Sequence, residues 1–230
     1  MATKISTDHI KRRVLPSLVI MLARNDRVPQ IGSRLRRHLG RRGRVELYFA
    51  FDDPNSAVAV IDLAVRLEEF DVQLVLRPVV KRGIKDDPAV ENKRIHAIND
   101  ARRLFKRSDL TMKRSDPIRP EATAFLARWV AAAPAGPALT AFCVVALKKL
   151  WLDEGTEIIP EAFAEIWKQN FGTSPPDSGE EAVRSNEKAM KRRGPYDTPA
   201  AWVHGQWFFA HDRLPQIADR LEDLGWRDAS

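Results

Sequence analysis

The sequence predicts an α/β fold in which a β-α-β unit and a β-β-α unit are separated by an all-helical block, with a basic helical extension in front. Three observations support this fold class. A β-branched and aromatic run at 45–51 passes into helical spacing at 54–69 and then into a second strand at 72–77. Helical patterns rich in alanine and leucine fill much of 88–193. Two short strands joined by a tight turn then precede a terminal helix.

The extension carries the positive charge of the chain. Residues 1–44 hold twelve basic and two acidic side chains, a formal charge of +10, whereas the other 186 residues hold twenty-six basic and twenty-nine acidic ones. Helical patterns at 8–24 and 28–39 are ended by the sequence GRRGR. We expect these two helices to pack on the body of the protein or on a second subunit, because they carry apolar residues beside their charges.

The first unit is predicted to pair its strands in parallel. Its helix places Val58, Ile61 and Val65 at helical spacing. Pro78 ends the second strand, because proline cannot donate to a strand ladder. A helix that links two neighbouring strands favours their parallel pairing.

The remaining elements divide the chain into three parts. The block is expected to contain helices at 88–107, 121–133, 136–152, 160–171 and 181–193, with loops at 114–120 and 172–180. Strands at 200–204 and 206–209 and a helix at 212–224 form the second unit. We therefore divide the chain into the extension, 1–44, a strand-containing domain, 45–85 with 194–230, and a helical insertion domain, 86–193.

Composition excludes several classes of protein. No window approaches the roughly 18 apolar residues that a membrane span needs. Cys143 is the only cysteine, so intramolecular disulfides, Cys-x-x-Cys redox centres and cysteine-rich metal sites are excluded. It lies in an apolar helical stretch, where we expect a buried structural thiol in a cytoplasmic protein. The five histidines show no metal-ligand spacing, and we expect no metal.

Five segments occur in an order that matches one known family: LYFAFDDPNSAVAV, QLVLRPVVKRGI, DLTMKRSDPIRPEATAFLARW, ALKKLWLDEGTEI and TPAAWVHGQWFFAHDRLPQIADRL. Their order is that of a thioredoxin-like fold with a helical insertion between its halves. From about 45 to 226 the chain resembles the DsbA-like family that contains 2-hydroxychromene-2-carboxylate isomerases and kappa-class glutathione transferases. The resemblance implies glutathione as cofactor, a small aromatic acid or electrophile as substrate, and a homodimer.

The resemblance points first to Asp53, at the start of the first core helix. Relatives carry a serine or cysteine directly before the proline, where the unpaired N–H groups and positive end of a helix stabilise a thiolate. Asp53 departs from that pattern, and Asp before Pro is also a favoured helix opening. We weigh two roles for it: a helix cap alone, or a general base or polar anchor. In the first turn, Ser56 is a second catalytic candidate and Asn55 a substrate-binding one.

The same resemblance assigns two segments to glutathione. Pro199 matches the family's cis-proline, whose preceding residue, here Thr198, presents its backbone to the cysteinyl part of the ligand. The alternative is an ordinary proline at the start of a strand. His211 and Asp212 occupy the helix start that holds the γ-glutamyl end. Asp212 is expected either to pair with the ammonium group of the ligand or to cap the helix.

Two further residues are assigned to the substrate. Arg77 precedes Pro78 and would bind a carboxylate of glutathione or of an acidic aromatic substrate. The alternative for Arg77 is a solvated charged face. Glu121 stands where many relatives carry an asparagine in the substrate pocket.

Three functions remain open at this stage. The first is a glutathione-dependent isomerase or transferase. The second is a degenerate family member that binds a ligand or a protein without turnover, which the missing serine and cysteine at the helix start favour. The third is association of residues 11–44 with nucleic acid or an acidic membrane. That stretch has no aromatic residue to stack on bases, so we do not expect nucleic acid as a partner.

Overall fold

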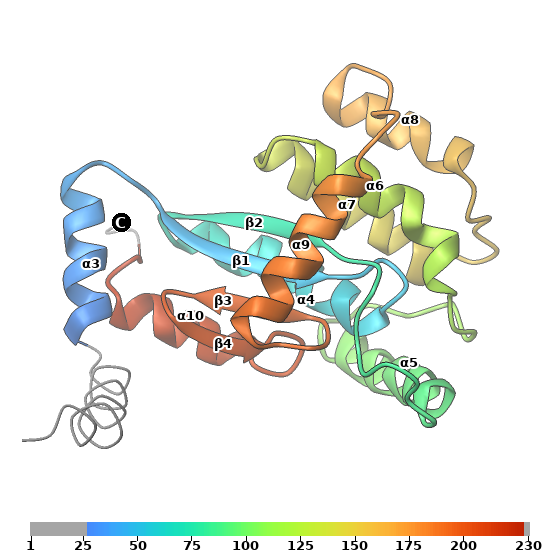
Figure 1. The fold of residues 1–230 in the computed structure, drawn as a ribbon, viewed down its shortest axis with the longest axis horizontal. Coiled ribbons are helices and arrows are strands. Elements are labelled where there is room, and N and C mark those ends of the chain that lie inside the picture. Colours follow the sequence, from blue (N-terminus) through green and yellow to red (C-terminus); the bar gives the residue numbers. More distant parts are fainter. Residues whose placement is uncertain (1–26, 228–230) are drawn as a thin grey trace, which may run out of the picture.

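A four-stranded mixed sheet forms the centre of the structure, a computed structural model that describes residues 27–227 (Figure 1). Its strands are β1 (Gly43–Phe49), β2 (Val72–Pro78), β3 (Ala200–Val203) and β4 (Gln206–Phe209), in the order β2-β1-β3-β4. β1 pairs with β2 in parallel, as the sequence predicts, and the other two pairings are antiparallel. The predicted fold class, β-α-β and β-β-α units around a helical insertion, is confirmed.

The two faces of the sheet are covered by different helices because successive side chains of a strand point to opposite faces. Val45, Leu47 and Phe49 are fully buried in the main apolar core, together with residues of α4 (Pro54–Arg66) and α10 (Leu214–Asp223). On the opposite face, Tyr48 packs with Met190 of α9 (Glu180–Arg193). Figure 1 shows α9 crossing that face.

The helical insertion lies between β2 and β3 in the chain. It contains α5 (Val90–Arg107), the 3₁₀ turn η3 (Pro120–Thr123), α6 (Ala124–Ala132), α7 (Pro137–Trp151), α8 (Pro160–Phe171) and α9. Its aromatic residues pack against one another; for example, the Trp129 and Trp167 rings lie 5.9 Å apart and are buried. Trp151 is fully buried in the same core as the sheet. The insertion and the sheet therefore share one continuous core.

The described part of the N-terminal extension is α3 (Arg27–His38), which lies at the end of the molecule opposite the helical insertion (Figure 1). Arg37 attaches it to the body by donating a hydrogen bond to the Gly225 carbonyl and by lying 5.6 Å from the Trp226 ring centre. Ile31, Leu35 and Leu39 are 59–65 % exposed. The helix expected at 8–24 lies outside the described residues.

Element boundaries differ little from those expected. The helix expected over 54–69 ends its α-helical part at Arg66 and closes with the 3₁₀ turn η2 (Leu67–Glu69). The terminal helix begins at Leu214, two residues later than expected. Within residues 27–227, no helix combines the length and the apolar character needed to cross a membrane.

Candidate functional site

Asp53 caps the first core helix. It has an extended backbone (φ −112°, ψ 114°) and precedes Pro54, the first residue of α4. One carboxylate oxygen accepts the Asn55 N–H at 3.1 Å, and the other accepts the Ser56 N–H at 3.2 Å. These bonds satisfy two of the N–H groups that a helix start leaves unpaired. The capping interpretation of Asp53 is therefore confirmed.

The cap also touches a segment far along the chain. Thr198 Oγ1 donates a hydrogen bond of 3.2 Å to Asp53 Oδ2, and the Thr198–Pro199 peptide bond is cis. The expected cis-proline is therefore confirmed, and the residue before it contacts Asp53. The end of β1 and the start of β3 bring these two segments together because the two strands are neighbours in the sheet.

Ser56 hydrogen-bonds to the capping carboxylate of Asp53 from the protein interior. It is fully buried; its hydroxyl donates to Asp53 Oδ2 at 2.6 Å and accepts the Ala50 N–H at 3.1 Å. Ser56 thus has no surface to offer a substrate, which does not support the catalytic contact expected of it. Asn55 is half-buried, and its side-chain oxygen has no hydrogen-bond partner in the described part of the chain.

A buried ion pair lies beside the cap. Arg82 donates to both oxygens of Asp52, at 2.9 and 2.8 Å, and its Nε lies 3.7 Å from Asp197. The Arg82 and Asp52 side chains are 16 % and 3 % exposed. Asp52 therefore faces the loop after β2 and does not face solvent. Neither the pairing with Arg82 nor the role of Asp197 follows from sequence spacing, although two adjacent acids at one buried helix start do signal a need for a counter-charge.

Burial controls the charge of the capping carboxyl. Asp53 is 7 % exposed, and this desolvation raises its pKa above the ordinary value of 3.8. The Arg82 charge and the Ser56 hydrogen bond act in the opposite direction, while Asp52 and Asp197 raise the pKa further. Asp53 therefore holds its proton to a higher pH than an exposed aspartate does.

The segments expected to hold glutathione lie around the cis peptide. The Thr198 N–H donates to Asp197 Oδ1 at 2.9 Å, so this backbone donor already has a partner. The Ala210 N–H donates to the Pro199 carbonyl at 3.0 Å, which places the following residue, His211, next to the bend. His211 is half-buried, and its Nδ1 has no partner within the described residues.

Asp212 does not cap the terminal helix. It is exposed, its carboxylate lies 3.8 Å from Arg213, and the residue at the capping position is Arg213, which makes no side-chain capping bond. The helix-cap alternative for Asp212 is therefore wrong, because α10 begins two residues beyond it. Pairing with a ligand's ammonium group stays a prediction.

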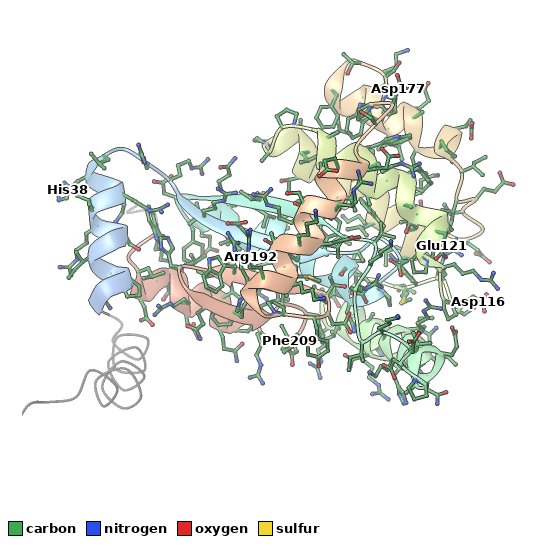
Figure 2. The ribbon with its side chains drawn as sticks, in the orientation of Figure 1. His38, Asp116, Glu121, Asp177, Arg192 and Phe209 are labelled. Carbon is green, nitrogen blue, oxygen red and sulfur yellow. The ribbon has the colours of Figure 1, made fainter. Side chains whose placement is uncertain are left out.

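The two residues assigned to the substrate lie elsewhere. Arg77 pairs in register with Tyr48, so its side chain leaves the sheet on the face opposite α4, where it contacts Glu46. Glu121 is exposed in η3 and lies in the helical insertion (Figure 2). The structure therefore does not bring Arg77 to the cap of α4, and the Glu121 side chain makes no hydrogen bond or ion pair with that cap within residues 27–227.

Searches against protein families and curated proteins find no match. Among solved structures, the chain is similar to a 2-hydroxychromene-2-carboxylate isomerase, with a TM-score of 0.60 and 15% identity over 79% of this chain and 96% of that one. It is also similar to a probable DsbA oxidoreductase from Streptomyces coelicolor, with a TM-score of 0.63 and 16% identity over 82% of this chain and 92% of that one. The chain has a DsbA-like thioredoxin fold. In this DsbA-like fold, the capped start of α4 and the cis peptide before β3 lie side by side.

Proposed function

We propose that this DsbA-like protein is a glutathione-dependent isomerase or transferase that acts on a small aromatic acid or electrophile. One observation carries the proposal. A buried carboxylate, Asp53, lies at the amino end of α4 within hydrogen-bond distance of Thr198, directly before the cis peptide. The fold thus brings an ionisable group, the amino end of a helix and an irregular backbone segment to one place.

The thiol for this chemistry must come from outside the chain. Dithiol–disulfide exchange needs two cysteines, whereas this sequence has one. Cys143 is fully buried in α7, and burial raises its pKa well above the ordinary value, which suppresses the reactive thiolate. An external thiol such as glutathione is therefore the source consistent with this chain. A single buried thiol also suits the cytoplasmic location that we propose.

The groups around the cap fit a ligand of this kind. His211 Nδ1 and Asn55 Oδ1 are polar atoms without a partner in the described chain, and both belong to segments that flank the cap. The Thr198 backbone would pair with the main chain of glutathione once Asp197 releases its N–H. Asp212, exposed next to His211, would pair with the γ-glutamyl ammonium group.

Asp53 is the residue that would move the proton. Bound glutathione would supply a sulfur nucleophile that adds to the substrate and leaves it again. Asp53 would accept the thiol proton on Oδ2 and return it when the sulfur departs, so that it ends in its starting state. The nearby Arg82 charge would limit the repulsion between the carboxylate and an incoming anion.

A second function, a ligand- or protein-binding module without turnover, has its own support. The Asp53 carboxylate already accepts four hydrogen bonds, two from backbone N–H groups and two from the hydroxyls of Ser56 and Thr198. A carboxylate with this many donors is stabilised as a structural cap. In that case the surface formed by Thr198, His211 and Asn55 would bind its partner without chemistry.

Three measurements separate the two functions. Calorimetric titration with reduced glutathione measures binding. An isomerase assay on 2-hydroxychromene-2-carboxylate and a conjugation assay on an aryl halide measure turnover. For the enzyme we expect glutathione-dependent turnover that Asp53→Ala lowers about 100-fold or more and that Asp53→Ser retains in part. Asp62→Ala is the matched control because Asp62 is an aspartate of α4 that pairs with Arg66. Binding without turnover supports the module, and the absence of both contradicts the enzyme.

We also propose that the protein is a homodimer. Ile31 and Leu35 lie on α3 and Leu39 directly follows it; the three are spaced four residues apart and are more than half exposed. Such a stripe is stabilised when a second copy covers it. Light scattering after size exclusion should give twice the chain mass, and Leu35→Asp should give the monomer mass. A monomer in the unaltered chain contradicts the proposal.

A further inference from the structure

A hollow of about 250 Å³ lies on the side of the sheet opposite α4. It is bounded by the edge strand β2, by the junction between α6 and α7, and by α9, elements that lie next to one another in Figure 1. Its wall combines aliphatic and polar side chains: Val75, Val130, Ala131, Ala133, Ala135 and Leu139 are aliphatic, and Gln73 and Asn186 are polar. Arg44 and Arg77 also line it.

The two arginines belong to a cluster with unbalanced charge. Arg44, Arg77 and Arg193 all surround Glu46, at 3.5, 3.4 and 3.2 Å respectively. Among residues 27–227, Glu46 is the one carboxylate in contact with all three, and its side chain is 9 % exposed. One negative charge against three guanidinium groups leaves a formal charge of +2 next to the hollow. An anion that enters the hollow would therefore be attracted by the arginines.

The guanidinium groups of Arg44 and Arg77 have N–H donors that are not used within the described residues. Arg44 approaches Glu46 through Nε at 3.5 Å, and Arg77 does so at 3.4 Å. Their terminal nitrogens donate no hydrogen bond within residues 27–227. Arg193 differs, because its Nη1 also contacts the Tyr48 hydroxyl at 3.3 Å and its guanidinium lies 5.8 Å from the Trp202 ring centre. Arg44 and Arg77 are therefore the donors that remain for a ligand, in the planar geometry that matches a carboxylate.

We propose that this hollow is a binding site for a small carboxylic acid with an apolar body. The Arg44 and Arg77 guanidinium groups take the carboxylate, and the aliphatic wall around Val75 and Leu139 takes the body. The site is separate from the capped start of α4, because Arg77 lies on the other face of the sheet. The cavity volume lies below the roughly 300–1,000 Å³ of drug-sized pockets, which indicates a ligand of about one ring.

Calorimetric titration with 3-phenylpropanoate tests the proposal, with its neutral amide and propanoate as probes that each lack one half of the ligand. We expect binding of the acid, and affinities at least about tenfold weaker for the amide and for propanoate. Arg44→Ala and Arg77→Ala should each weaken binding of the acid by about tenfold or more. Arg66→Ala, which removes an exposed arginine of α4, is the control and should bind the acid unchanged.

Glu46→Gln gives a second test, because a merely structural cluster predicts no gain from it. Glu46→Gln removes the negative charge that faces Arg44 and Arg77, so the cluster becomes more positive and attracts an anion more strongly. Binding of 3-phenylpropanoate should therefore tighten. Equal affinities for the acid and the amide would overturn the proposal. So would an affinity that Asp53→Asn lowers and Arg77→Ala leaves unchanged, because the acid would then bind at the cap of α4.

Discussion

The hydroxyl of Thr198 donates a hydrogen bond to the Asp53 carboxylate at 3.2 Å, across 145 residues of chain. This bond joins the amino end of α4 to the peptide that precedes β3. On one side the carboxylate holds the helix N–H groups, and on the other it holds the cis peptide. One buried acid therefore links the two halves of the fold, in addition to the pairing of β1 with β3.

Removal of Arg82 should unfold the protein at a much lower denaturant concentration. Arg82→Ala leaves the Asp52 carboxylate buried without its partner, and such a loss costs about 3–5 kcal/mol. Urea unfolding followed by circular dichroism measures the change. Arg66→Ala is the control: it breaks an exposed pair with Asp62 and should cost no more than about 1 kcal/mol. Similar losses in the two variants would show that the Arg82–Asp52 pair is not buried.

The Asp53 carboxyl should make stability fall as the pH rises. Its pKa is raised in the folded protein by burial, so the folded chain binds this proton more tightly than the unfolded chain. This contribution is complete below the ordinary pKa of 3.8 and is lost as the pH rises through the higher folded pKa. Asp53→Asn keeps a capping side chain but does not titrate.

Urea unfolding of both proteins between pH 4 and about pH 8 isolates the Asp53 contribution. The wild-type chain should lose stability relative to Asp53→Asn as the pH rises through this range. A wild-type chain that gains on the variant would mean that the pKa of Asp53 is lowered in the folded state. A constant difference would mean that it is unchanged.

Loss of the Trp151 indole N–H should weaken the contact between α7 and the segment that joins β1 to α4. Trp151 Nε1 donates to the Phe51 carbonyl at 3.1 Å, and the indole is fully buried. Trp151→Phe leaves that carbonyl unpaired and creates a cavity, at a cost of about 2–4 kcal/mol of unfolding free energy. Trp207→Phe removes a comparable bond to the Arg193 carbonyl at a half-exposed position, where water replaces it, so its cost should be below about 1 kcal/mol. Chemical denaturation compares the two.

Much of the fold follows from local pattern in the sequence. The alternation in 45–51 and the helical spacing after Pro54 each determine an element without help from distant residues. Proline and glycine mark several boundaries: Pro78 ends β2, and Gly172 ends α8 in a left-handed conformation (φ 69°). The later start of α10 shows the limit of such signals, because two polar residues before Leu214 can either begin a helix or precede one.

The candidate site is predictable only where the family resemblance reaches. The resemblance located the cis peptide and Asp53. Arg82 and Asp197 lie in loops, and sequence periodicity does not predict how two loops meet. Arg77 shows a different failure. Its nearness to Pro78 in the chain suggested the site, but strand alternation sends its side chain to the other face of the sheet. A functional role should therefore be predicted for a strand residue only after the face of the sheet to which its side chain points has been determined.

Gly179, which directly precedes α9, should tolerate no side chain. A Cβ at this position would lie 2.2 Å from the Arg128 carbonyl oxygen of α6, which is backbone and has little room to move. Gly179→Ala must therefore separate α9 from α6, at a cost of about 1–3 kcal/mol. Gly136, which directly precedes α7, has a similar φ (167° against 164°) and nothing within 4 Å of an added Cβ. Gly136→Ala should change the free energy of unfolding by no more than about 1 kcal/mol.

Hydrogen exchange gives the Gly179 variant a local signature. Because α9 covers one face of the sheet, its amides and those of β2 should exchange faster in Gly179→Ala, while the amides of α10 on the other face should keep their protection relative to global stability. Uniform acceleration would mean that the substitution lowers global stability without loosening α9. Unchanged exchange and unchanged stability would contradict the close approach of Gly179 to Arg128, because a clash of that size with a carbonyl oxygen must displace one of the two helices.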